Sequence, residues 1–208
     1  MWQATDEQAE AMVRFAVGEA GYRHIDTAAA YGNERGVGRG IVEAGVPREE
    51  LFITTKLWNA DHGRDATLRA FDAGLARLGL DAVDLYLIHW PLQDRVELVE
   101  TWHAMEEIAR SGRARSIGVC NFEPHHLDWI AAESEVTPAV NQVELHPHLP
   151  QYVVRAYNAY RGIATQSWSP LGGTSGSGWA RRPGRTRCST TRLCAPWPTG
   201  TASRWPRC

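Results

Sequence analysis

LFITTK, residues 51–56, is a nearly continuous run of apolar and β-branched residues that ends on a charged one. Such a run is typical of a strand buried on both faces of a parallel sheet. It lies between two longer stretches, residues 34–44 and 65–78, whose apolar residues recur at helical spacing. A strand placed between two helices predicts a βαβ unit with parallel strands.

The same unit repeats along residues 5–171. The expected strands are His24–Thr27, Leu51–Lys56, Leu85–His89, Arg115–Cys120, Ala139–Glu144 and Ile163–Trp168. The expected helices are Asp6–Ala20, Glu34–Ala44, Asp65–Leu78, Val96–Arg110, Pro124–Ala132 and Gln151–Tyr160. An open doubly wound sheet and a (β/α)8 barrel both fit this alternation. No G-x-G-x-x-G follows the first strand, which weighs against a dinucleotide-binding doubly wound sheet.

Four chemically capable residues stand at or just after the ends of the first three strands: Asp26, Tyr31, Lys56 and His89. Lys56 is the only lysine in the chain. Carboxyl ends of barrel strands meet at one face, so these side chains are expected to converge. An ammonium lowers the pKa of a neighbouring phenol, which makes tyrosine a better acid, and a neutral histidine can orient a carbonyl oxygen.

Each of these residues also has a purely structural interpretation. Asp26 and Lys56 fit a structural ion pair, Tyr31 a rim aromatic, and His89 a core histidine. The joint pattern favours a site. His125, His126, His146 and His148 invite a metal interpretation, but no carboxylate or thiol accompanies them at ligand spacing, so capping or solvated histidines and no metal are expected.

Six segments follow one another along the chain: residues 21–28 with Tyr31, Asn33 and Glu34, then residues 52–58, 85–91, 116–122, 138–144 and 167–172. In this order they resemble the aldo-keto reductase family, and the bacterial group similar to 2,5-diketo-gluconate reductases in particular. Each segment alone is weakly specific, whereas six at family spacing over residues 2–172 are highly specific.

The resemblance implies an α/β fold of the (β/α)8 TIM-barrel type and NAD(P)H-dependent reduction of an aldehyde or ketone to an alcohol. Tyr31 would be the general acid, Asp26 and Lys56 would tune it, and His89 would orient the substrate. The intact family member would be a monomer acting on a small-molecule carbonyl compound.

The resemblance also assigns a cofactor site for NADPH and a substrate pocket. Asn121 and Gln142 would hold the nicotinamide carboxamide, Trp168 would stack on the ring, and Ser169 and Leu171 would approach the pyrophosphate. Cys120 stands where the family usually has a serine as a carboxamide contact, and a thiol donates only weakly. Trp2, Trp58 and Trp90 would line an apolar pocket.

The resemblance spans barrel strands two to seven, so strands one and eight are expected to be missing and the barrel incomplete. Residues 1–172 are predicted to be a partial barrel, and residues 173–208 a non-native, disordered tail. The tail composition favours a frameshift, because back-translation read in another frame yields an amphipathic helix like the family's helix before strand eight. Sequencing the gene tests this: the idea fails if no single-base change restores a family-like C-terminus.

Composition bounds the partners. All 24 acidic residues precede Thr174, whereas seven of the 22 basic residues follow it, so the tail is basic. The tail contains no recognisable nucleic-acid-binding module, so no nucleic acid is expected to bind there.

No apolar run approaches the roughly 20 residues of a membrane helix. Residues 1–7 do not resemble a signal peptide, which favours the cytoplasm.

Two functional hypotheses remain. The first is an NAD(P)H-dependent carbonyl reductase. The second is a catalytically inactive, poorly folded remnant of such an enzyme, whose basic tail binds anions without specificity. Nicotinamide binding discriminates between them.

Overall fold

The computed structural model describes residues 1–172, which fall into two compact units. The first unit comprises residues 1–143 and 152–166, and it contains all the α-helices described below. The second comprises residues 144–151 and the described residues from 167 onward. The expectations for the tail, residues 173–208, lie outside the described residues.

Helices and strands alternate as expected. The α-helices are α1 (Asp6–Gly18), α2 (Glu34–Glu43), α3 (Arg64–Leu78), α4 (Arg95–Arg110), α5 (Pro124–Glu133) and α6 (Tyr152–Tyr160). The strands are β1 (His24–Asp26), β2 (Phe52–Leu57), β3 (Val83–Ile88), β4 (Ala114–Cys120), β5 (Val140–Glu144) and β6 (Ala164–Trp168). Three short 3-10 helices lie in the connections between these elements: η1 (Ala29–Tyr31), η2 (Arg48–Glu50) and η3 (Asn59–Asp61).

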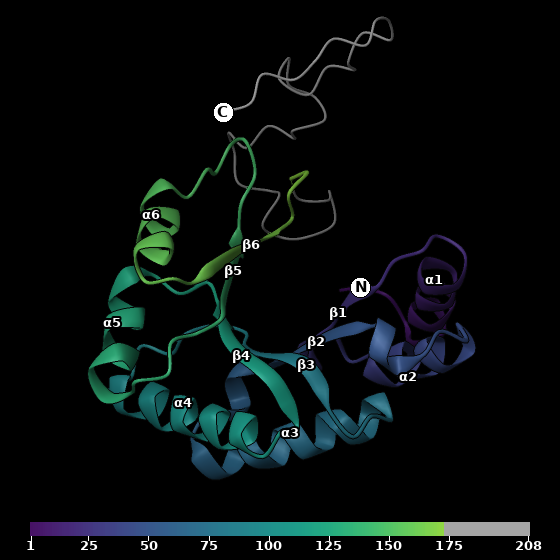
Figure 1. Cartoon of the computed structure of the whole chain (residues 1–208), viewed down its shortest axis with the longest axis horizontal. Helices are drawn as coiled ribbons and strands as arrows, with labels where there is room; N and C mark the ends of the chain where they lie inside the picture. The colour runs from purple at the N-terminus through teal and green to yellow at the C-terminus, as the bar shows by residue number, and fades with distance from the viewer. Residues whose placement is uncertain (173–208) are drawn as a thin grey trace, which may run out of the picture. The chain divides into compact units, whose positions relative to one another are not determined.

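The six strands form one sheet in chain order, β1-β2-β3-β4-β5-β6, and the strand pairs from β1 to β5 are all parallel. Each strand therefore lies beside the one that precedes it in the chain. A doubly wound sheet would change direction at a switch point, whereas a barrel keeps this order. The fold is α/β, with six consecutive strands of the barrel type and the helices along one side of them (Figure 1).

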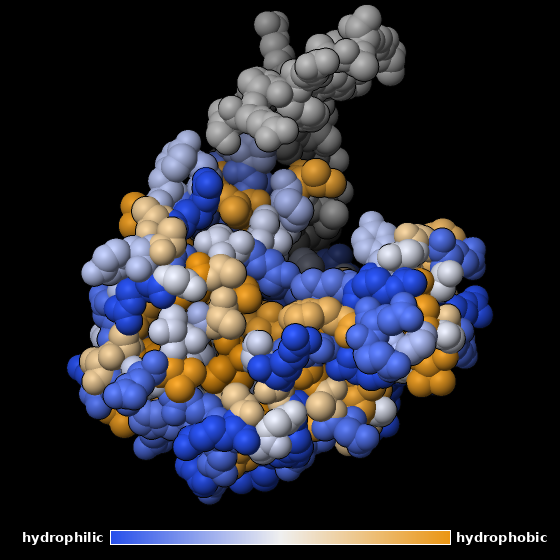
Figure 2. Space-filling view, in the orientation of Figure 1, coloured by the Kyte–Doolittle hydropathy of each residue, from blue (hydrophilic) through white to orange (hydrophobic). Residues whose placement is uncertain are grey.

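Alternation along the strands gives the sheet two different faces. Odd-numbered residues of β2, such as Ile53 and Leu57, join the main core with the helices. Leu85, Leu87 and Cys120 form a second, smaller cluster with Phe52 and Val140 packed against it. Lys56 lies in the same alternation set as Phe52, so it faces away from the helices. The outer helices present mostly hydrophilic side chains, whereas hydrophobic side chains are visible near β4 (Figure 2).

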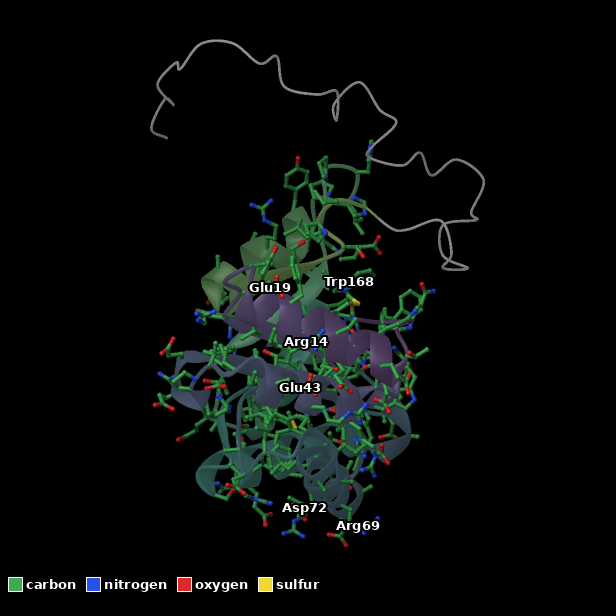
Figure 3. The ribbon with its side chains drawn as sticks, turned by 90° about the vertical axis from the view of Figure 1, so that its right-hand side faces the viewer. Arg14, Glu19, Glu43, Arg69, Asp72 and Trp168 are labelled. Atoms are coloured by element: carbon green, nitrogen blue, oxygen red, sulfur yellow. The ribbon has the colours of Figure 1, made fainter. Side chains whose placement is uncertain are left out.

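Two polar contacts join helix α1 to α2, one near each end of α1. The Asp6 carboxylate accepts the Gly36 backbone N–H at 2.8 Å, and Arg14 points toward Glu43 at 3.7 Å (Figure 3). The Arg14–Glu43 pair is exposed and contributes little. Burial of Val13 and Val17 against the core supplies the main attachment.

No helix within residues 1–172 has both the length and the hydropathy needed to cross a membrane.

Candidate active site

Lys56 and Asp26 form an ion pair between neighbouring strands. Parallel register places Asp26 opposite Thr54, two residues before Lys56. The Lys56 Nζ donates to Asp26 Oδ1 and, at 2.9 Å, to the Thr27 carbonyl oxygen. The Lys56 side chain is only 1% exposed. Burial is the largest single influence and lowers the pKa of Lys56, but the Asp26 charge, the Tyr31 and Cys120 groups and the hydrogen bond to Asp26 together outweigh it. The pKa therefore lies above the usual value and the amine is charged.

Tyr31 ends η1 and lies beside this pair. The Lys56 Nζ is 5.4 Å from the centroid of the Tyr31 ring. Burial raises the pKa of Tyr31 above its usual value, and the Lys56 charge opposes this without overcoming it. The expected lowering influence of the ammonium is therefore present, but desolvation is the larger effect here. The phenol is protonated at neutral pH and can act as a proton donor.

His89 follows β3 directly and completes the group of four. Its backbone N–H donates to the Leu57 carbonyl at 3.1 Å, which extends the β2–β3 ladder by one residue. Its ring meets the Tyr31 ring edge-on at 5.8 Å and the Trp58 ring at 5.3 Å. Burial, helped by the Lys56 charge, lowers the pKa of His89 to about 4. The imidazole is neutral at physiological pH.

Gln142 of β5 joins the same network. Its Nε2 donates to Asp26 Oδ2 at 2.7 Å and to Gln166 Oε1 at 3.1 Å. Within residues 1–172 its Oε1 accepts only from the weak thiol of Cys120, at 3.9 Å. Burial raises the pKa of Cys120, so the sulfur keeps its proton. Asp26 is thus held by two side chains that come from strands far apart in the sequence.

Asn121 follows β4 in the left-handed region, at φ 62°, which asparagine tolerates better than most residues. Its Nδ2 donates to the His89 carbonyl oxygen at 3.0 Å. Asn121 thereby ties the end of β4 to the residue that ends the predicted catalytic set.

Two members of the network were not predicted. The Thr27 contact uses a backbone carbonyl, which leaves no signal in the sequence. Gln166 carries a detectable signal, because it is a polar residue two positions before Trp168 and therefore belongs to the same alternation set on β6.

The remaining predicted residues are less enclosed or lie in the second unit. Trp2 and Trp58 are 55% and 39% exposed, and Trp90 follows His89 and is half-buried. The second unit holds Trp168, Ser169 and Leu171. The Trp168 carbonyl accepts the Leu145 N–H at 3.4 Å, Ser169 has φ 48°, and Leu171 is 85% exposed.

A hollow of about 470 Å³ lies elsewhere, at the start of α3, lined by His62, Gly63, Arg64, Asp65, Ala66, Glu100 and His103. Its only guanidinium, that of Arg64, already pairs with Asp65 and Glu107. The hollow contains none of the converging residues, so its size does not make it the catalytic centre. Among residues 1–172, no three His, Cys, Asp or Glu side chains are grouped as a metal site.

Comparison with known proteins places this geometry in context. A model of the aldo/keto reductase family matches residues 1–201. The chain is 56% identical over 172 residues to an aldo-keto reductase of Mycolicibacterium smegmatis, covering 83% of this chain and 62% of that protein. It is 51% identical over 171 residues to the methylglyoxal reductase DkgA of Escherichia coli, covering 82% and 61% respectively.

Solved structures agree. The crystal structure of an aldo-keto reductase from Bombyx mori in complex with NADP superposes with a TM-score of 0.77 at 43% identity, covering 84% of this chain and 62% of that one. The chain therefore spans about three fifths of the length of the relatives it matches.

Proposed function

Because this chain belongs to the aldo/keto reductase family, we propose that its site reduces an aldehyde or ketone to an alcohol with a hydride from NADPH. One observation carries the proposal: a buried, charged Lys56 paired with Asp26 lies against the Tyr31 ring, beside a neutral His89. This is the set of groups that protonating a carbonyl oxygen requires.

In the proposed reaction Tyr31 is the general acid. Its phenol is protonated at neutral pH and donates to the carbonyl oxygen. The Lys56 ammonium stabilises the phenolate that is left, and Asp26 keeps the ammonium charged and in place. His89 is neutral, so it carries one N–H with which to orient the carbonyl oxygen without adding a competing positive charge.

The amides beside this set suit a nicotinamide. Gln142 has both amide protons engaged, by Asp26 and Gln166, while its carbonyl oxygen accepts, among the described residues, only from a thiol at 3.9 Å. That oxygen can accept from a carboxamide N–H, and we assign Gln142, Asn121 and Cys120 to this group. When bound, the reduced nicotinamide would supply the hydride. The cofactor roles of Trp168, Ser169 and Leu171 stay predictions from the family resemblance.

For the substrate we propose a small carbonyl compound, as the name of the similar methylglyoxal reductase indicates for that protein. Trp58 beside His89 supports this, because its ring supplies an apolar contact next to the group that would orient the carbonyl. Trp2 and Trp90 are proposed to extend the same apolar lining.

Titration with NADPH, followed by quenching of protein fluorescence and by the change in nicotinamide emission, tests the proposal. We expect saturable binding that is weakened in Gln142→Leu. The alternative, a catalytically inactive remnant of such an enzyme, predicts no saturable binding, so absence of NADPH binding would contradict the proposal and favour that alternative.

A further inference from the structure

Glu34 is a buried charge that the proposed reaction does not use. Its side chain is 1% exposed, although a carboxylate pays a large desolvation penalty in such a place unless it is fully paired. Here each of the two carboxylate oxygens of Glu34 accepts a hydrogen bond. The Arg77 Nε donates to Glu34 Oε2 at 2.7 Å, and the Thr55 hydroxyl donates to Glu34 Oε1 at 2.5 Å.

The two partners lie on different elements. Thr55 precedes Lys56 on β2, and Arg77 is in the last turn of α3. Side chains alternate along a strand, so Thr55 faces the helices while Lys56 faces the proposed site. Glu34 begins α2, three residues after Tyr31. Glu34 therefore contacts β2 on the face opposite to the one that carries Lys56.

The segment that carries Tyr31 is thus tied to β2 at both ends. At its start, the Lys56 Nζ bonds the Thr27 carbonyl at 2.9 Å, and the Thr27 N–H donates to the Thr54 carbonyl at 2.9 Å. At its end, Glu34 bonds Thr55. Between these anchors lies η1, whose N-cap residue, Ala28, makes no side-chain hydrogen bond to it.

We propose that Glu34, with Thr55 and Arg77, is a positioning residue that sets the separation between the Tyr31 phenol and the Lys56 ammonium. This rests on the proposed function only in naming Tyr31 as the acid; the clamp itself is a statement about geometry. Loosening it lets η1 and the Tyr31 ring move away from Lys56.

Lys56 is the only lysine in the chain, so labelling with carbon-13 lysine gives one side-chain signal. The test measures the nuclear Overhauser cross-peak between the Lys56 ε-methylene and the Tyr31 ring, assigned by its loss in Tyr31→Leu. We expect Thr55→Val, which keeps the shape and removes the hydroxyl, to lose most of this intensity. Thr55→Ser should retain it, and Glu34→Gln should lie between them.

A matched control is a second contact to the same strand, β2. Asp84 of β3 accepts the Ile53 N–H of β2 at 2.8 Å and pairs with Arg48 at 2.7 Å, so it is also a carboxylate that joins an arginine to β2. Asp84→Asn should destabilise the sheet and leave the cross-peak unchanged. An unchanged cross-peak in folded Thr55→Val, or an equal loss in Asp84→Asn, overturns the clamp.

Carbonyl-dependent NADPH oxidation separates this outcome from the proposed function. If the wild-type chain turns over, Thr55→Val should lower the rate roughly tenfold while Thr55→Ser does not. If the wild-type chain does not turn over, the proposed function fails, and the cross-peak still decides the clamp.

Discussion

Asp26 is the residue on which the candidate site converges. Its carboxylate takes Lys56 on one oxygen and Gln142 on the other, and it is 31% exposed, so part of it still reaches solvent. The ammonium that it neutralises is almost fully buried. Without a counter-charge, a buried ammonium either loses its proton or destabilises the fold.

Asp26→Asn tests this dependence. The amide keeps the size of the side chain and removes the charge, so Lys56 loses its counter-ion. We expect the free energy of unfolding to fall by about 3 kcal/mol, as for other buried pairs that lose one partner. Urea denaturation at pH 7 measures it. A change no larger than that of an exposed pair, such as Arg14→Ala beside Glu43, would mean that Lys56 is stable without Asp26.

Buried histidines make a second residue-level prediction. Burial lowers the pKa of His62 to about 4, whereas an unfolded histidine titrates near 6.5. Between these values the unfolded chain binds the proton and the folded chain does not, so stability falls as the pH drops from about 6.5 to about 4. The slope is at most ~1.4 kcal/mol per pH unit for each such histidine.

His62→Gln should flatten this dependence, because the side chain at 62 is then neutral in both states. Urea midpoints between pH 4 and 7 for the two chains are the measurement. His89, lowered to about 4 by the same cause, remains in both, so part of the slope should persist. Identical slopes would show that His62 does not contribute.

At the scale of elements, helix α2 shows how the sequence fixes the site's supports. It is unusually rich in glycine, and all three of its glycines lie where another backbone approaches closely. A Cβ on Gly36 would lie 2.0 Å from the Asp6 carbonyl oxygen of α1, and one on Gly38 would lie 2.2 Å from the Leu78 carbonyl oxygen of α3. These close approaches fix how α2 packs between α1 and α3.

Gly36→Ala is therefore expected to destabilise the chain, even though alanine is the better helix former. The steric overlap with backbone should cost about 2 kcal/mol, which exceeds the intrinsic gain in helix propensity of about 1 kcal/mol, so a net loss of about 1 kcal/mol remains. Gly74→Ala in α3 is the matched control, because a Cβ there meets only the flexible end of Arg77 at 3.7 Å. The midpoint of thermal unfolding, Tm, should fall for Gly36→Ala and rise for Gly74→Ala. A shift of both Tm values in the same direction would contradict this expectation.

Most of the fold could be predicted from the sequence, since the apolar runs and the helical spacing between them mark β1 to β6 within a few residues. The predicted start of β3 lies two residues too late, because Asp84 interrupts the apolar run; its carboxylate is satisfied by Arg48 and Ile53. Pairings such as Gln142 with Asp26 join residues 116 apart in sequence, and no local pattern encodes them. The same holds for Glu34, whose partners became visible only once three elements were packed.

At the scale of the whole molecule, the proposed acid chemistry is contained in the first unit. Asp26, Tyr31, Lys56, His89 and Gln142 all belong to it. The chain spans about three fifths of the length of its relatives, and the activity of the whole chain is a proposal that a direct assay tests.

The most direct measurement is aldehyde-dependent oxidation of NADPH by the full 208-residue chain, with Tyr31→Phe alongside. Phenylalanine keeps the ring and removes the proton donor, so cofactor affinity should be unchanged. We expect NADPH consumption that requires both the aldehyde and Tyr31, with a rate at least roughly 100-fold lower in Tyr31→Phe. No consumption by wild type, or equal consumption by a variant that binds NADPH equally well, would contradict it.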